Sequence, residues 1–500
     1  MRDATVELKH GRLRGKTDRG AAAFLGIPFA AAPFGVNRMR PPQPVEAWNG
    51  VRDATEYGPT CPKGDYPPQY AQLFPEVTIA GEQCLNLNVW SPDPAASGLP
   101  VLVWIHGGSF TNGSGSAAEY RGSAFARDGI VCVTINYRLG AEGFLYLGDG
   151  IANLGLLDQI AALHWVQDNI AAFGGDPGRI TVAGESAGAM SITNLLSMPG
   201  TAGLFHQAIA QSGAAAHTLS AAEGRMVSGY LAGALGVPPS RDAITALPLD
   251  QVVQAARALT DEVRTAPDPA RWGRIALDRL PFEPTIDGQV LPRAPLESLL
   301  SGAGSDVRLM IGTTLNEARL FFVPTGVMDL VDDATVEAGA AAYGLAAADV
   351  AVYRAGLPGA GNGDVLAAII TDWFYRVPAI RVAEARAASP GTAEPGNTWM
   401  YRFDYQSPAF DGQLGACHGV EIPFVFDTLD VPGTRPRVGD NPPQPVADTA
   451  HRVWVSFVAD GSPGWSPYDT TTRTTALINE TAGIVNDPAG GERRLWEGRR

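Results

Sequence analysis

The chain has 500 residues, of which 45% are hydrophobic and 18% charged, and this provides enough apolar material for a large globular core. Its formal net charge of −15 excludes a protein that binds nucleic acid mainly by neutralising phosphates. The apolar run 21–36 follows basic residues, but it is too short and too broken by proline to span a membrane or to make a good signal peptide. We therefore expect no nucleic-acid partner, no membrane span and a cytoplasmic location, with secretion left open if a signal has been removed.

Hydrophobic periodicity predicts strands and helices in alternation over the first half of the chain. Residues 4–17 and 22–29 alternate in the manner of a hairpin, and 85–90 alternates as a strand. The runs 101–105 and 130–135 are apolar throughout, which is typical of central strands covered on both faces. After them we expect, in chain order, a helix at 154–173, a strand at 179–183, a helix at 187–196 and a strand at 206–210.

The second half continues the sheet between two helical blocks. Short helical patterns with breaks at proline fill 220–300, and a second block covers 333–388. Strands are expected at 307–312, 398–403 and 475–478, and helices at 450–459 and 492–500. Because strands alternate with helices, we expect one α/β domain over 1–500 with helical insertions at about 220–300 and 325–390.

The pentapeptide Gly184-Glu185-Ser186-Ala187-Gly188 lies between a predicted strand and a predicted helix. Strand, G-x-S-x-G and helix in this order are the sequence form of a nucleophile elbow, whose turn is so tight that the neighbours of the serine must be small. The serine then lies at a helix start, where free N–H groups favour developing negative charge. A glycine-rich turn with an inert serine is the alternative, and the flanking strand and helix favour a nucleophilic Ser186.

A serine hydroxyl needs a base, and in sheets of this type the partners follow in the order serine, acid, histidine. Of the seven histidines, His418 and His451 lie far enough along the chain, whereas His217 comes too early for an acid to precede it on a later strand. His451 opens an apolar helix, where a surface or capping role is more ordinary. We predict His418 as the base, against the alternative of a loop histidine bonded to backbone.

The acid is expected just past a strand end, where it can reach the imidazole from the same rim. Glu317 fits, because it follows the strand near 309–312 by a short turn and begins a helix. Asp306 lies at the wrong end of that strand, and Asp287 lies in an Asp-Gly turn. A helix-start carboxylate is also a common structural cap, which is the competing interpretation. We predict Glu317 as the acid that holds the histidine tautomer.

The oxyanion of an acyl-transfer reaction needs converging N–H donors. Residues 105–110, Ile-His-Gly-Gly-Ser-Phe, follow a predicted strand and resemble the H-G-G-G loop of esterases and lipases. The amide of Ala187, directly after the nucleophile, is the complementary donor. A plain Gly-Gly turn is the alternative, but its place after a sheet strand favours one half of an oxyanion hole.

Four cysteines are present. Cys61 and Cys84 bracket a loop rich in proline and tyrosine and could close it as a disulfide, which would contribute about 3 kcal/mol in an oxidising compartment. Cys132 lies in an apolar run, where a buried free thiol is expected. No Cys/His cluster has metal-ligand spacing, so we expect no metal and no cofactor.

Further motifs run along nearly the whole chain. They are Phe-Leu-Gly-Ile-Pro-Phe-Ala at 24–30, Glu-Gln-Cys-Leu-Asn-Leu-Asn-Val-Trp at 82–90, Phe-Gly-Gly-Asp-Pro at 173–177 leading into 184–188, and Gly-Ala-Cys-His at 415–418 with Glu421. Together they resemble the type-B carboxylesterase family of α/β-hydrolases, which includes para-nitrobenzyl esterases and cholinesterases. The resemblance implies the α/β-hydrolase fold: a large, mostly parallel mixed sheet flanked by helices, with helical insertions that form a cap over the active site.

The resemblance also implies roles for individual residues. It implies the triad Ser186, Glu317 and His418. It implies oxyanion amides at Gly108, Ser109 and Ala187, with Gly107 setting the turn. It further implies the auxiliary pair Glu185 and Ser212, the ion pairs Arg38–Glu82 and Arg138–Asp158, and the disulfide Cys61–Cys84. Ser109 departs from the family's pattern, which usually has a third glycine there, and Gln83 replaces a common aspartate.

We therefore expect a serine hydrolase of carboxylic esters that works through an acyl-enzyme. A carbamate or amide hydrolase with the same triad is the nearest alternative, and a non-catalytic binding protein on this fold is a distant one because serine, acid and histidine are all present. The expected partner is a small, apolar or aromatic ester, bound by a monomer or a small homo-oligomer. By family analogy the pocket is lined by Phe110, Phe321, Phe322, Trp373 and Phe374, although core packing explains these residues equally well.

Overall fold

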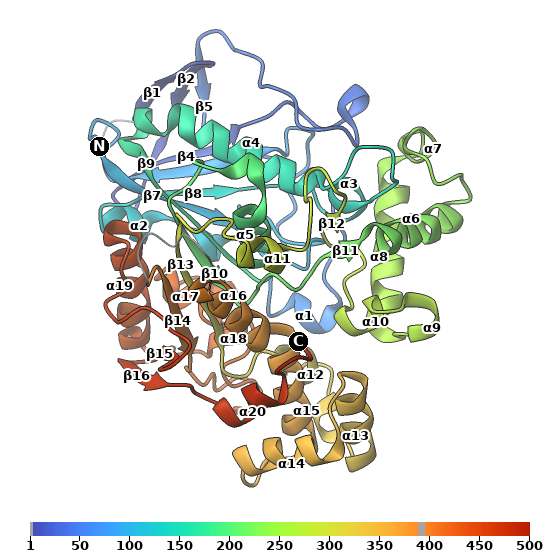
Figure 1. Cartoon of the computed structure of the whole chain (residues 1–500). Helices are drawn as coiled ribbons and strands as arrows, with labels where there is room; N and C mark the ends of the chain where they lie inside the picture. The colour runs from blue at the N-terminus through green and yellow to red at the C-terminus, as the bar shows by residue number, and fades with distance from the viewer. Residues whose placement is uncertain (1–3, 389–395) are drawn as a thin grey trace.

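One large sheet runs through the middle of the computed structural model, which describes residues 4–388 and 396–500 (Figure 1). In chain order its strands are β3 (Lys16–Asp18), β4 (Ala21–Pro28), β6 (Asn86–Ser91), β7 (Leu99–Ile105), β8 (Val131–Ile135), β9 (Gly175–Glu185), β10 (Gln207–Gln211), β13 (Arg308–Thr314), β14 (Thr398–Phe403), β15 (Thr474–Ile478) and β16 (Ala482–Asn486). Over the described ranges these 11 strands lie in the spatial order β16-β15-β14-β13-β10-β9-β7-β8-β6-β4-β3.

The central part of the sheet is parallel. Every neighbouring pair from β15 through β14, β13, β10, β9 and β7 to β8 is parallel. Antiparallel pairs close the two ends, β15 with β16 on one side and β8, β6, β4 and β3 on the other. Because parallel strands share a direction, the carboxyl ends of β7, β9, β13 and β14 meet at one edge, which is where an open α/β sheet places its ligands.

Strand β7 shows why the central strands are apolar throughout. Val101, Val103 and Ile105 pack into one core cluster, and Leu102 and Trp104 pack into another on the opposite face. All five are at most 1% exposed. The first cluster includes α4 (Leu154–Asn169) and α5 (Ala187–Ser197), and the second includes α2 (Ser123–Arg127), α17 (Ile422–Val425) and α19 (Gln444–Asp460). The prediction that 101–105 and 130–135 are strands covered on both faces is confirmed.

Two blocks of helices lie beside these layers (Figure 1). The first contains α6 (Ala221–Leu235), α7 (Arg241–Thr245), α8 (Leu249–Thr265), α9 (Pro269–Trp272) and α10 (Ile275–Asp278). The second contains α13 (Asp333–Ala342), α14 (Ala347–Gly356) and α15 (Asn362–Thr371). Two further helices, α11 (Pro295–Leu300) and α16 (Val377–Ala388), lie against the sheet layers, where α11 packs on α5 and α16 packs on β13 and β14. The second block has its own core, in which Tyr353 and Trp373 pack with Trp496, the residue after α20 (Gly490–Leu495).

Short elements complete the fold. They are α1 (Pro68–Ala71), α3 (Gly140–Phe144), α12 (Arg319–Phe322), α18 (Arg435–Val438), and the paired strands β11 (Leu219–Ser220) and β12 (Thr285–Ile286). Nowhere in 4–388 or 396–500 does a helix combine the length and the apolar character that crossing a bilayer requires.

The beginning of the chain holds two hairpins where the sequence predicted one. β1 (Thr5–Leu8) and β2 (Gly11–Arg14) form the first, in a small sheet with β5 (Val51–Asp53). β3 and β4 form the second, at the edge of the main sheet. The alternating pattern marks strands correctly but does not say which sheet each strand joins.

One of the two implied ion pairs is present and the other is not. Arg138 and Asp158 form a buried pair with Nη2 and Oδ1 2.6 Å apart, as expected. Arg38 pairs instead with Glu142, whose Oε1 lies 2.8 Å from Nη2, while Glu82 is exposed. The Arg38–Glu82 expectation is therefore wrong. Arg38 also donates to the backbone carbonyl of Leu247 at 2.6 Å, and this contact holds the guanidinium in an interior position that Glu142 shares.

The cysteines are all free and buried, so the expected Cys61–Cys84 disulfide is absent. The two residues nevertheless lie together, with Sγ of Cys61 3.7 Å from the carbonyl oxygen of Cys84. Burial raises the pKa of the Cys61 thiol well above its usual range, which keeps it protonated. The pair packs as two small apolar side chains under the loop that it brackets.

Candidate active site

Ser186 lies in a sharp turn between β9 and α5. Its backbone has φ 56° and ψ −122°, a conformation that a non-glycine residue adopts only where the surroundings enforce it. A Cβ added to Gly184 would lie 2.5 Å from the carbonyl oxygen of Ile105, and one added to Gly188 would lie 2.0 Å from the same atom. Glycine is required at both positions because the turn is pressed against the end of β7. The arrangement is the elbow geometry that the pentapeptide predicted.

His418 and Glu317 meet at the same edge of the sheet. Nδ1 of His418 lies 2.7 Å from Oε2 of Glu317, which gives a buried hydrogen bond between them. The other carboxylate oxygen of Glu317 accepts from the backbone N–H of Thr314 at 2.8 Å. Glu317 is fully buried and His418 is 5% exposed. Because Nδ1 donates to the carboxylate, Nε2 of the neutral imidazole carries the lone pair and can accept a proton.

The loops that carry these two residues are tied together by backbone. The N–H of Asn316 donates to the carbonyl of Ala416 at 2.9 Å, and the N–H of Ala416 donates to Oδ1 of Asn316 at 3.2 Å. The N–H of His418 donates to the carbonyl of Glu317 at 3.3 Å. These bonds join segments that are 101 residues apart in sequence, and they fix the imidazole relative to the carboxylate.

Glu185 lies on the other side of the imidazole. Its Oε1 is 3.1 Å from Nε2 of His418, without a hydrogen bond to any described residue. Burial lowers the pKa of His418, but the carboxylates of Glu185 and Glu317 outweigh burial and raise the pKa to about 9. Burial likewise raises the pKa of the Glu185 carboxyl. The nearby carboxylates at His418 and burial at Glu185 therefore both favour a bound proton at this end of the site.

The loop after β7 presents its backbone to Ser186. A Cβ on Gly107 would lie 2.6 Å from Oε2 of Glu185 and 3.1 Å from Cβ of Ser186, so this residue must be glycine. Gly108 has φ +109°, and its carbonyl accepts from the N–H of Asn112 at 2.9 Å. This tight turn leaves the N–H groups of 107–109 without an acceptor in the described structure. The arrangement can bind an oxyanion.

Two aromatic rings flank the imidazole. The ring centroid of Tyr375 lies 4.7 Å from that of His418, and the ring of Phe321 lies 5.7 Å away. Tyr70 extends this wall, since its hydroxyl donates to the carbonyl of Phe321 at 3.3 Å. Phe321 was among the expected pocket residues, whereas Tyr375 and Tyr70 were not. The arrangement can hold an apolar or aromatic group beside the base.

The other expected pocket residues occupy different positions. Phe110 is fully buried and packs on Phe144 with ring centroids 4.8 Å apart. Trp373 is 5% exposed and lies in the core of the second helical block, against which Phe322 also packs. Phe374 stacks on His217 with ring centroids 4.1 Å apart. Each of the four therefore has a packing role in the described structure.

A third buried carboxylate, Glu421, lies behind the site. Its Oε1 accepts from Nε2 of Gln211 at 3.1 Å, and Oε1 of Gln211 accepts from Nε1 of Trp454 at 2.8 Å. Burial, followed by the charge of Glu317, raises the pKa of Glu421 to about 7. Ser212 is fully buried, and its hydroxyl has no hydrogen-bond partner among the residues that the structure describes. The sequence placed Glu421 only as a motif match, and its long-range contacts could not be inferred from it.

The remaining histidine candidate has ordinary partners. Nδ1 of His451 lies 2.7 Å from the carbonyl of Val425, and Nε2 lies 2.9 Å from Oδ2 of Asp128, which is away from the sheet edge that carries Ser186. Within 4–388 and 396–500, no group of three or more His, Cys, Asp or Glu side chains is arranged to hold a metal ion.

Comparisons with known proteins show the family to which the chain belongs. Residues 2–343 and 356–491 match the model of the carboxylesterase family. The chain is 36% identical to the para-nitrobenzyl esterase of Bacillus subtilis (strain 168) over 99% of this chain and 98% of that protein. It is 38% identical to the phenmedipham hydrolase of Pseudarthrobacter oxydans over 91% of this chain and 89% of that protein.

Solved structures show the same likeness across the whole fold. The crystal structure of carboxylesterase EST55 from Geobacillus stearothermophilus superposes with a TM-score of 0.85 at 35% identity, covering 98% of this chain and 99% of that one. A structure of PNB esterase superposes with a TM-score of 0.82 at 34% identity, covering 99% of both chains. The chain therefore belongs to the carboxylesterase family, has the α/β-hydrolase fold, and is a hydrolase that acts on carboxylic esters.

Proposed function

We propose that the protein is a serine esterase that works through an acyl-enzyme, with Ser186 as the nucleophile, His418 as general base and acid, and Glu317 as the orienting carboxylate. The observation that carries the proposal is the 2.7 Å contact between Nδ1 of His418 and Glu317, at the sheet edge where the elbow turn ends. This contact fixes the tautomer that can accept a proton at Nε2. The Ser186 hydroxyl must then donate to Nε2, a hydrogen bond that commonly tightens only when substrate binds.

The first half-reaction forms the acyl-enzyme. Oγ of Ser186 attacks the ester carbonyl carbon while Nε2 of His418 takes the hydroxyl proton. The backbone N–H groups of Gly108, Ser109 and Ala187 bind the carbonyl oxygen as it gains negative charge. When the tetrahedral intermediate collapses, the bond to the alcohol oxygen breaks, and the alcohol leaves with the proton from Nε2.

The second half-reaction restores the enzyme. Nε2 of His418 takes a proton from water, whose oxygen attacks the acyl carbon, and the acid leaves as Ser186 regains its proton. Glu317 stays ionised throughout and stabilises the imidazolium. Glu185, 3.1 Å from Nε2, adds a second negative charge on the same imidazolium. Phe321 and Tyr375 support an apolar or aromatic substrate group next to the base.

An organophosphonate probe tests the nucleophile. We expect it to label Ser186 in the wild-type protein, and we expect Ser186→Ala to lower kcat for para-nitrophenyl acetate by about 10⁶-fold. Ser301→Ala serves as the matched control, because Ser301 is exposed at the end of α11. Full turnover by Ser186→Ala refutes the assignment.

A substrate panel distinguishes an ester hydrolase from a carbamate hydrolase, the nearest alternative. The same groups would serve a carbamate or an amide, but a carbamate acyl-enzyme is cleared slowly. We expect steady turnover of aryl esters and, with aryl carbamates of matched size, a burst followed by a much slower rate. Equal steady rates on both series favour the carbamate hydrolase.

A further inference from the structure

The helical segment ahead of α16 widens into a π-turn at Asp372–Arg376. Pro378 follows shortly after it and has no backbone N–H. An N–H at that position would reach the carbonyl of Phe374 in an α-helix and the carbonyl of Trp373 in a π-helix. Pro378 therefore accounts for the change of pitch, since it removes one helical hydrogen bond at this point, and each of the two carbonyls accepts from a side chain instead.

Two side chains from distant parts of the sequence donate hydrogen bonds to the carbonyls of Phe374 and Trp373. Nε2 of His217 donates to the carbonyl oxygen of Phe374 at 2.9 Å, and Nε of Arg500 donates to that of Trp373 at 3.0 Å. The same side chains also stack on the residues that they bond. The His217 ring lies 4.1 Å from the Phe374 ring, and the Arg500 guanidinium lies 3.9 Å from the Trp373 ring. Trp373 and Phe374 are thus each held by both backbone and ring.

His217 is suited to this role because it is neutral. It is fully buried, and burial lowers its pKa to about 4. Its Nδ1 lies 3.6 Å from Glu283 and 3.9 Å from Asp278, in neither case with a hydrogen bond. Burial raises the pKa of Glu283 to about 8, so this carboxyl keeps its proton at neutral pH. The single imidazole proton therefore stays on Nε2, directed at Phe374.

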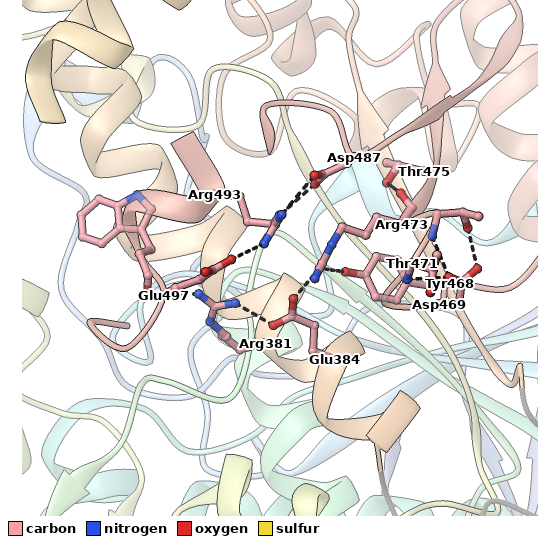
Figure 2. Close-up of polar contacts among 12 residues, drawn as sticks. Arg381, Glu384, Tyr468, Asp469, Thr471, Arg473, Thr475, Asp487, Arg493 and Glu497 are labelled. Atoms are coloured by element: carbon pink, nitrogen blue, oxygen red, sulfur yellow. Dashed lines mark hydrogen bonds and ion pairs between the residues drawn. The ribbon is translucent and has the colours of Figure 1, made fainter. Parts of the chain in front are cut away.

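Arg500 is held in place by the segment before it. Arg493 of α20 forms an ion pair with Asp487 at 2.8 Å, and Arg381 of α16 lies beside the same network (Figure 2). Arg381 donates to the carbonyl of Trp496 at 3.0 Å and to the carbonyl of Arg500 at 2.9 Å. These bonds fix the backbone from which the Arg500 side chain reaches the turn.

A second line of hydrogen bonds joins the same segment to the first residue of the π-turn. Nε1 of Trp496 donates to the hydroxyl of Tyr353 at 2.7 Å, and that hydroxyl donates to Oδ2 of Asp372 at 2.6 Å. All three residues are buried. The turn is therefore anchored through the side chain of Asp372 as well as through the carbonyls of Trp373 and Phe374.

The turn also carries Tyr375, whose ring lies 4.7 Å from the ring of His418. We propose that His217 and Arg500 are positioning residues of the esterase: by donating to the carbonyls of Phe374 and Trp373, they hold the π-turn in the geometry that places Tyr375 against His418. This inference rests on the proposed function, in which His418 is the base. Loss of either donor lets the turn relax, and the displaced ring changes the alignment of the imidazole.

Paired variants of His217 test the inference. His217→Leu keeps a similar volume and removes the donor, and we expect it to lower kcat for para-nitrophenyl acetate by about 10-fold to 100-fold with a smaller change in KM. His217→Gln keeps an N–H donor directed at Phe374, and we expect it to recover most of kcat. Melting temperatures measured on the same samples separate loss of alignment from loss of fold.

A second pair keeps the test decisive if His217→Leu does not fold. Arg500→Met removes the donor and the charge, and Arg500→Lys retains a cation with N–H donors. We expect kcat to fall in Arg500→Met and to recover partly in Arg500→Lys. Arg494→Met is the control, because Arg494 is an exposed arginine on α20, the short helix that precedes Arg500.

Two outcomes overturn the inference. One is wild-type kcat in both His217→Leu and Arg500→Met. The other is an equal loss of kcat in each pair that follows the fall in melting temperature without rescue, which assigns both residues to stability alone. Ser186→Ala in the same assay separates this failure from failure of the proposed function, since hydrolysis that survives Ser186→Ala refutes the latter.

Discussion

Two buried histidines of this protein lie among carboxylates, and their environments shift their pKa values in opposite directions. At His418, Nδ1 is 2.7 Å from Glu317 in a hydrogen bond, and the pKa rises to about 9. At His217, Nδ1 faces Glu283 at 3.6 Å without a hydrogen bond, and the pKa falls to about 4. Burial lowers the pKa of both residues. At His418 the charges of Glu185 and Glu317 outweigh burial, whereas at His217 the charge of Asp278 offsets only part of it and the charge of Arg500 lowers the pKa further. Distance and hydrogen bonding, rather than residue type, decide which buried imidazole can act as a base.

The largest expected effect comes from removing the carboxylate at His418. Glu317→Gln keeps the size of the side chain but no longer selects the reactive tautomer, and we expect kcat to fall by about 10⁴-fold. Glu283→Gln is the matched control at His217, and we expect kcat close to that of the wild type because Glu283 is already uncharged at neutral pH. Comparable losses of kcat in Glu317→Gln and Glu283→Gln would contradict the different roles assigned to the two carboxyl groups.

The next effect concerns the loop that faces Ser186. In Gly107→Ala the new Cβ would lie 2.6 Å from Oε2 of Glu185, so the oxyanion loop must move away from the nucleophile. We expect kcat to fall by about 100-fold with little change in KM. Gly229→Ala is the control, since nothing lies within 4 Å of its added Cβ. An unchanged kcat in Gly107→Ala contradicts the oxyanion role of this loop.

The pH dependence of kcat/KM is a further test of the different environments of His418 and His217. His418 must be neutral to act as a base, so activity should rise with pH, and the rise should lie above the ordinary imidazole value of 6.5. Glu185→Gln removes a negative charge next to the imidazolium, which lowers the pKa of His418 and moves the rise to lower pH. Glu283→Gln should leave the rise where it is. A profile that stays in place in Glu185→Gln contradicts the effect of the Glu185 charge on the pKa of His418.

The smallest expected effect is on the pH dependence of the protein's stability, and it comes from Glu283 beside His217. The pKa of Glu283 rises from 4.5 to about 8 on burial, so the folded protein keeps a proton that the unfolded chain releases between these values. The free energy of unfolding therefore falls as pH rises through this window. Glu283→Gln has no proton to release there, and its melting temperature should gain on that of the wild type from about pH 5 to pH 8. Parallel melting curves across this range contradict the raised pKa.

The local sequence was sufficient to predict a site residue wherever that residue comes shortly after the end of a strand. Ser186 follows β9 and Glu317 follows β13 closely, and the carboxyl ends of parallel strands lie at one edge. The sequence alone therefore predicts that such residues lie at the same edge of the sheet, without knowledge of their contacts. The contact of His418 with Glu185 is different in kind, because it depends on the conformation of a loop.

Long-range pairing and changes of helix pitch could not be inferred in the same way. Family analogy directed attention to Trp373 and Phe374, whereas the ring that lies against His418 is that of Tyr375, which the π-turn carries. Pro378 was the available signal, since a proline inside a helix requires a local change. Arg38 pairs with Glu142 rather than Glu82, and no local pattern distinguishes such partners. Strand β16 is mostly exposed, so it lacks the apolar alternation that marks a strand.

The most direct test of the central claim is mass spectrometry of the enzyme after rapid acid quenching during turnover of a para-nitrophenyl ester. The account predicts one acyl group on the peptide that contains Ser186, more of it in Glu317→Gln if deacylation is slowed more than acylation, and none in Ser186→Ala. An acyl group on another residue, or hydrolysis by the wild type with no covalent adduct under conditions in which deacylation limits the rate, would contradict it.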